Sequence, residues 1–104
     1  MTTSRLEALK SLVEKNPKNP LARFGLANEL YKLEKFEETV AEITAYLEIG
    51  NDEGAAYRIL GDSYHKLGQI PEARSAYRRG IDVANSHGHP SMAEEYEEVL
   101  EFLD

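Results

Sequence analysis

Residues 26–50 read LANELYKLEKFEETVAEITAYLEIG, and residues 60–84 read LGDSYHKLGQIPEARSAYRRGIDVA. Aligned 34 positions apart, the two stretches carry apolar, small and acidic residues at the same places. The matching pairs are Leu26/Leu60, Ala27/Gly61, Leu30/Tyr64, Leu33/Leu67, Phe36/Ile70, Glu38/Glu72, Thr39/Ala73, Ile43/Tyr77 and Leu47/Ile81. A fixed period of this length is typical of stacked-repeat proteins. Such proteins present extended surfaces, so the period favours binding over chemistry.

The bulk composition narrows the class of protein. A chain of 104 residues is predicted to form one domain, 1–104. Its formal net charge of −7 argues against a general affinity for nucleic acid or anionic membranes. Cysteine is absent, no apolar run is long enough to span a bilayer, and the first residues lack the apolar core of a signal peptide. The predicted location is therefore the cytoplasm.

The apolar periodicity is helical throughout and predicts six helices and no strand. The expected spans are 3–16, 20–32, 36–50, 53–67, 70–86 and 91–104. Ser4 and Ser91, each followed three residues later by Glu, predict capping boxes at the first and last helices. Asn19 and Asp52 are the expected caps of the second and fourth helices. Gly50-Asn51 predicts a left-handed end to the third helix.

Outward positions of two helices form a candidate binding set. Leu26, Leu30 and Leu33 are the expected core-facing stripe of helix 20–32. Residues two positions out of step with this stripe fall on roughly the opposite side of the helix. With the flanking lysine, and with the equivalent positions 34 residues later, the set is Phe24, Asn28, Tyr31, Lys32, Arg58, Asp62, His65 and Lys66.

The repeated positions resemble those of the tetratricopeptide repeat. The second unit matches the family signature better, with Tyr57, Leu60, Gly61 and Tyr64 followed by Gly68, Ala73 and Tyr77. Small residues in the signature lie where two helices cross closely, and the aromatic rings fill the space around the crossing. The first unit departs more, because it has Arg23 at the position of the first aromatic residue and Thr39 at that of the first alanine.

The resemblance covers Thr3 to Ala84 and implies an all-α right-handed solenoid of antiparallel helix pairs. Residues 20–50 and 53–86 are the two expected repeats. Residues 3–16 keep the 34-residue phase and are predicted to be the second half of a repeat, whereas 91–104 lose the phase and are predicted to cap the array.

In this family the first helix of each repeat lines a concave groove, here helices 20–32 and 53–67. The resemblance therefore implies a protein–protein interaction module that binds a peptide in this groove. Arg58 and Lys66 are suited to a carboxylate, and Asn28 to a peptide backbone. One subclass holds acidic chaperone tails with a carboxylate clamp. Asn28 matches that clamp, but Phe24 and Ile59 replace two of its residues, so a chaperone co-factor is not expected.

Other interpretations remain open at this stage. Phe24 can pack against the N-terminal helix instead of lining a groove, and Asn28, Asp62 and Lys66 can be ordinary solvated positions. A second copy can cover the apolar end of the half repeat, which predicts a monomer or a weak homodimer. The chain can also be an adaptor encoded beside its partner. His87 and His89 are too few ligands for a metal site, so no metal, cofactor or enzymatic activity is predicted.

Overall fold

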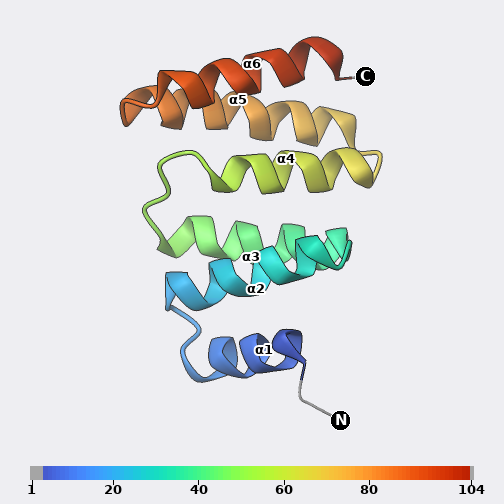
Figure 1. Ribbon diagram of the computed structural model, residues 1–104, viewed down its shortest axis with the longest axis vertical. Coiled ribbons are helices and arrows are strands. Elements are labelled where there is room, and N and C mark those ends of the chain that lie inside the picture. Colours follow the sequence, from blue (N-terminus) through green and yellow to red (C-terminus); the bar gives the residue numbers. More distant parts are fainter. Residues whose placement is uncertain (1–3, 104) are drawn as a thin grey trace. The chain divides into compact units, whose positions relative to one another are not determined.

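The computed structural model describes residues 4–103, which form six α-helices and no strand (Figure 1). The helices are α1 (Arg5–Lys15), α2 (Pro20–Lys32), α3 (Phe36–Ile49), α4 (Ala56–Lys66), α5 (Ile70–Ser86) and α6 (Pro90–Phe102). Thr3 and Asp104, which the predicted first and last helices include, lie outside the described residues. The chain forms two compact units, Met1–Gly50 and Asn51–Asp104. Across residues 4–103, no helix is both long and apolar enough to cross a membrane.

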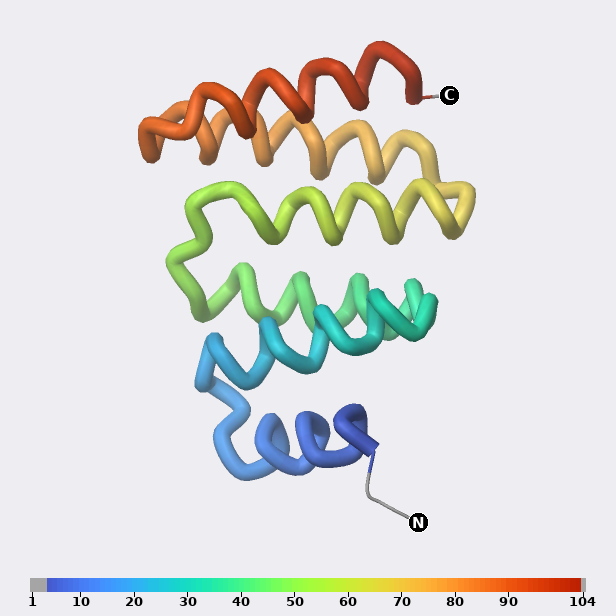
Figure 2. The backbone as a smooth tube through the Cα atoms, in the orientation of Figure 1, coloured from blue at the N-terminus to red at the C-terminus, as the bar shows by residue number. Residues whose placement is uncertain are grey.

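The first unit is built around α2, which packs against both α1 and α3 (Figure 2). Its buried cluster contains Leu9, Val13, Ala22, Leu26 and Leu30. Each fully buried leucine of this kind stabilises the fold by about 1.5–3 kcal/mol. The prediction that Leu33 joins this core is wrong. Leu33 is 48% exposed, because it caps the end of α2 and lies beyond the buried cluster.

The second unit is built around α5, which packs against α4 and α6. Two glycines allow the helices to approach closely, as predicted for Gly61. A Cβ atom on Gly61 would lie 2.5 Å from Cε1 of Tyr77, and one on Gly80 would lie 2.6 Å from Cε2 of Tyr96. Non-bonded carbon atoms do not approach this closely. Glycine is therefore what lets each tyrosine ring lie against the neighbouring helix backbone.

The three short turns, which join α2 to α3, α4 to α5 and α5 to α6, share one backbone geometry. Each contains a residue with left-handed φ: Glu34 (60°), Gly68 (77°) or Gly88 (77°). The next N–H donates to the carbonyl five residues back, from Lys35 to Leu30 (2.9 Å), Gln69 to Tyr64 (2.9 Å) and His89 to Ala84 (2.8 Å). These bonds satisfy backbone carbonyl groups at the C-terminal ends of α2, α4 and α5. The third turn departs from the 34-residue spacing but keeps the geometry of the other two.

Two of the predicted helix starts are confirmed. Ser4 Oγ accepts a hydrogen bond from the backbone N–H of Glu7 at 3.1 Å, and Asn19 Oδ1 accepts one from Leu21 N–H at 3.0 Å. Such caps satisfy backbone donors that the first turn of a helix leaves free.

The other two starts differ from the prediction. Helix α4 begins at Ala56, three residues late, although Asp52 Oδ2 still accepts from the N–H of Ala56 at 3.0 Å. Helix α6 begins at Pro90 and has no side-chain cap, so the prediction that Ser91 caps it is wrong. The turn at Gly88 already fixes where α6 begins, and proline fits the first helical position.

The predicted left-handed end of α3 is also wrong. Gly50 is extended, with φ −103° and ψ 165°, and its N–H donates to the carbonyl of Tyr46 at 2.7 Å. A Cβ atom on Gly50 would lie 2.9 Å from Cε1 of Tyr46. Glycine is therefore needed at this helix end for space and not for a positive φ.

Candidate partner-binding surface

The aromatic members of the predicted set on α2 are held by α3. The ring of Phe24 lies 5.1 Å from that of Tyr46, and the ring of Tyr31 lies 6.0 Å from that of Phe36, measured between centroids. Both α2 rings are partly buried. The structure thus gives Phe24 an aromatic partner on α3, whereas the alternative from sequence expected it to pack on the N-terminal helix. Pairs of this kind hold the rings in preferred orientations.

The polar members on α2 are less constrained. Asn28 is partly buried, and its side-chain amide makes no hydrogen bond within residues 4–103. Lys32 is exposed and forms no ion pair with any described residue. An amide and an ammonium group one turn apart on the same helix offer a donor, an acceptor and a positive charge.

Asp62 holds the charged members on α4 in place. Its Oδ2 atom lies 3.3 Å from Nε of Arg58, and its Oδ1 atom accepts a hydrogen bond from the hydroxyl of Tyr77 on α5. Because one carboxylate serves both groups, the Arg58 side chain has a preferred orientation although half of it is exposed. Lys66 is exposed and makes no ion pair among the described residues.

His65, one turn after Asp62 on α4, lies at a shallow hollow of about 350 Å³ formed with the end of α6. The other lining residues are Glu98, Val99, Phe102 and Leu103. The side chain of Phe102 is 82% exposed beside this hollow. The structure therefore divides the predicted set into a strip on α2, a strip on α4 and this hollow. Sequence periodicity did not indicate the hollow, because α6 loses the 34-residue phase.

Arg23 and Glu42 form a contact that sequence analysis missed. Nη1 of Arg23 lies 2.8 Å from Oε1 of Glu42 on α3, and Nε donates to the carbonyl of Pro17 at 3.0 Å. The equivalent residues of the second unit are Tyr57 and Ala76. An ion pair in the first unit therefore replaces the large aromatic and small residue of the second. The signal was an arginine at the position of the first signature aromatic residue, with a glutamate 19 residues later where the second unit has alanine.

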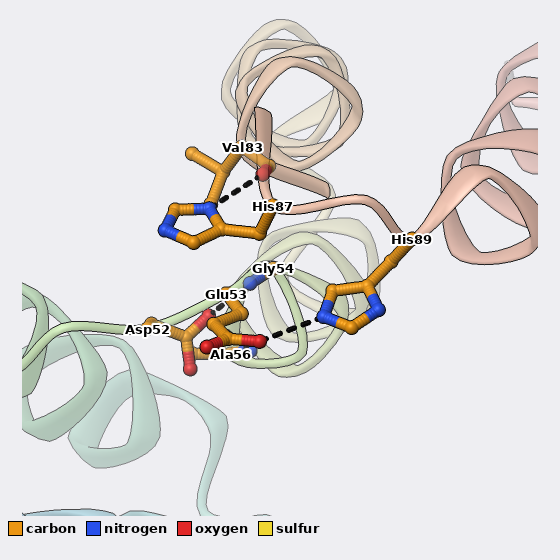
Figure 3. A network of polar contacts seen from close by, with 7 residues as sticks. All are labelled: Asp52, Glu53, Gly54, Ala56, Val83, His87 and His89. Atoms are coloured by element: carbon orange, nitrogen blue, oxygen red, sulfur yellow. Dashed lines mark hydrogen bonds and ion pairs between the residues drawn. The ribbon is translucent and has the colours of Figure 1, made fainter. Parts of the chain in front are cut away.

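The two histidines between α5 and α6 have different partners (Figure 3). His89 Nε2 lies 2.7 Å from Oε1 of Glu53, whereas Nδ1 of His87 lies 2.9 Å from the carbonyl of Val83. The hydrogen bond from His89 holds the pKa of the Glu53 carboxyl below its ordinary value of 4.5. In the part of the chain that the structure describes, no three His, Cys, Asp or Glu side chains are grouped to hold a metal ion.

Comparison with known proteins identifies proteins that are similar in sequence to this chain. No protein-family model matches the chain. The TPR repeat-containing protein PA0015 of Pseudomonas aeruginosa is 26% identical over 99 residues, which cover 95% of this chain and 94% of that protein. Anaphase-promoting complex subunit 3 of Dictyostelium discoideum is 27% identical over 78 residues, 75% of this chain but only 8% of that protein. The chain is thus similar to tetratricopeptide-repeat proteins.

A solved structure supports the helical-repeat fold of this chain. The solution structure of protein BPP2914 from Bordetella parapertussis matches with a TM-score of 0.82 at 24% sequence identity. The match covers 96% of this chain and 87% of that chain. The predicted all-α helical-repeat class is thereby confirmed. The likeness to tetratricopeptide-repeat proteins supports a protein–protein interaction module in general terms.

Proposed function

We propose that the protein binds an extended or helical segment of a partner protein along the exposed faces of α2 and α4, the first helix of each repeat. The contacting residues are Phe24, Asn28, Tyr31 and Lys32 on α2 and Arg58, Asp62, His65 and Lys66 on α4. Rigid helices present these side chains in fixed positions, so little conformational freedom of the module is lost on binding. Catalysis and a cofactor have no part in this proposal, and the proposed compartment is the cytoplasm.

The observation that carries the proposal is a set of polar groups left without partners. The amide of Asn28 and the ammonium groups of Lys32 and Lys66 make no hydrogen bond or ion pair among residues 4–103. These cations stand on two helices of a chain whose net charge is −7. Groups that have no partner in the free protein can exchange water for a ligand without breaking an internal contact.

The chemistry of these groups favours a segment with carboxylates. Arg58 is held by Asp62 yet is half exposed, so a ligand carboxylate can share its guanidinium. Asp62 lowers the local positive charge, and this limits the attraction of polyanions such as nucleic acid. The edges of Phe24 and Tyr31 supply apolar contact beside Asn28. An acidic segment with an apolar side chain fits this combination best.

A comparative pull-down from lysate of the source organism, read by mass spectrometry, tests the proposal. The bait variants are wild type, Asn28→Ala/Arg58→Glu and a control, Asn85→Ala/Arg79→Glu, which makes the same substitutions at exposed positions of α5. We expect proteins that wild type and control retain and the first variant loses. A segment of such a protein is then titrated calorimetrically against all three. Equal affinity for all three contradicts binding on α2 and α4.

A further inference from the structure

The first helix presents a strip that its own unit does not cover. Helix α1 buries Leu9 and Val13 but leaves Leu12 49% exposed. At 100° per residue, Arg5, Ala8 and Lys15 fall within about 60° of Leu12, whereas the acidic Glu7 and Glu14 fall on the other side. All four residues of this group are exposed. We call Arg5, Ala8, Leu12 and Lys15 the head strip. It has an apolar centre and basic ends. Nε of Arg5 lies 3.2 Å from Oε1 of Glu29 on α2, but the Arg5 side chain is 69% exposed and can share a second carboxylate.

The last helix presents a strip of opposite charge. Phe102 is exposed beside the hollow lined by His65, Val99 and Leu103. Glu95 and Glu98 fall within about 40° of Phe102 around the helix. Helix α6 contains no basic residue. We call Glu95, Glu98 and Phe102 the tail strip. Its aromatic side chain and hollow form an apolar end, and the remainder is acidic.

We infer that the tail strip of one copy binds the head strip of a second copy. The two strips are opposite in charge, and each offers one large exposed apolar side chain. Seven residues, about 10.5 Å of helix, separate Leu12 from Arg5 and likewise Phe102 from Glu95. When Leu12 packs against Phe102, a base on the head strip therefore faces an acid on the tail strip. Because the two strips of one sequence are complementary, we expect the occupant of the hollow to be a second copy of this chain.

The contact is expected to be weak. Two single helices bury less than the roughly 1,000 Å² typical of stable interfaces, and the net charge of −7 repels copies at long range. The contact shares only His65, at the hollow, with the proposed peptide-binding set, and it uses neither the free amide nor the lysines of α2 and α4. Failure of one leaves the other intact.

Sedimentation velocity at about 1 mM protein tests the inference with one variant for each strip. Leu12→Glu blocks the head strip, and Phe102→Glu blocks the tail strip. Leu33→Glu is the control, since Leu33 is as exposed as Leu12 at 48% and lies outside both strips. We expect wild type and control to associate and each blocked variant to stay monomeric. An equimolar mixture of the two blocked variants keeps one intact contact and should form dimers and nothing larger.

Charge reversal gives a second reading that does not depend on the apolar substitutions. Arg5→Glu should weaken association about tenfold by placing a carboxylate opposite Glu95 of the tail strip. Adding Glu95→Lys to the same chain should restore it. The inference is overturned by a monomeric wild type at 1 mM, by a blocked variant that associates like wild type, or by a mixture that stays monomeric. Thermal melts confirm that each variant is folded.

Discussion

The hydroxyl of Tyr96 donates a hydrogen bond of 2.5 Å to the carbonyl oxygen of Gly54, forty-two residues earlier in the chain. The contact joins α6 to the segment that leads into α4, and both residues are buried. Tyr96 also lies against Gly80 of α5 and 6.0 Å from the ring of Tyr77. One side chain thus connects all three helices of the second unit.

Replacing Tyr96 by Phe should lower the free energy of unfolding by about 1–2 kcal/mol, because the buried carbonyl of Gly54 loses its donor. Urea denaturation followed by circular dichroism measures the change. Tyr64→Phe is the matched control. The Tyr64 hydroxyl makes no hydrogen bond within the described chain, so a change below about 0.5 kcal/mol is expected. Equal effects of the two substitutions would contradict the role of the hydroxyl.

The same tyrosine should make stability fall at alkaline pH. Burial raises the pKa of Tyr96 to about 12, from 10.0. The folded state thus keeps a proton that the unfolded state releases. The resulting stability is fully present below about pH 10 and is lost as pH rises through 12. The difference in unfolding free energy between wild type and Tyr96→Phe should be smaller at pH 11.5 than at pH 8. The same difference at both pH values would contradict the raised pKa of Tyr96.

The first and second repeats should respond with opposite sign at equivalent turn residues. Glu34 has φ 60° and Gly68 has φ 77°, and a non-glycine residue in this region costs about 1–2 kcal/mol. Glu34→Gly relieves this strain but raises the conformational entropy of the unfolded chain. The net effect should be a free energy of unfolding higher by about 0.5–1 kcal/mol. Gly68→Glu should destabilise by a similar amount. No heavy atom lies within 4 Å of a Cβ at Gly68, so strain alone is measured.

Thermal and urea unfolding of both turn variants provides the check. A destabilised Glu34→Gly protein would show that the glutamate makes a contact worth more than the backbone strain. A neutral Gly68→Glu would show that the left-handed turn is not costly for that side chain.

The ion pair between Arg23 and Glu42 should contribute more to the free energy of unfolding than the pair between Lys10 and Glu38, which also joins α3 to another helix of the first unit. Both side chains are about four-fifths buried, with 21% and 22% exposed. A double-mutant cycle to alanine should give a coupling of about 1 kcal/mol. Lys10 and Glu38 are 3.9 Å apart and about half exposed, so their cycle should give less than about 0.3 kcal/mol. Equal coupling in the two cycles would contradict the importance of burial here.

Glu53 should titrate at lower pH than an ordinary glutamate. The hydrogen bond from His89 lowers its pKa below 4.5, so its small stabilising effect is present above that pH and is lost as pH falls through the lowered pKa. The side chain of Glu53 is 60% exposed and that of His89 is 41% exposed, so the pKa itself is the better observable. An NMR titration of the carboxyl carbon should show a lowered midpoint that returns to the ordinary value in His89→Ala. The same midpoint in both proteins would exclude the pair.

Much of the fold was predictable from local sequence. Asn19 followed by Pro20 places the start of α2, and the short segment Leu33–Lys35 ends it. Gly61 and Ala73 are small because two helices cross there, and both are fully buried. Each of these signals acts within one turn of helix or repeats at the 34-residue period. Periodicity and capping chemistry therefore reveal them without a structure.

The candidate surface was less predictable, because helical spacing gives a direction but not a partner. Phe24 was expected on the outward side of α2, and only the packed unit brings Tyr46 to its ring. Asp62 was predicted as a member of the candidate set, but its hydrogen bond from Tyr77 needs α5 beside α4. The hollow at His65 arises only where the end of α6 meets α4.

The sequence by itself determined six helices, their order and the repeat, because these follow from interactions between residues a few positions apart. Tertiary structure alone decided that Gly50 is extended beneath Tyr46, that Leu33 faces solvent, and that Arg23 pairs with Glu42. Each of these depends on which side chains from distant positions share a small volume, and that depends on how the helices pack.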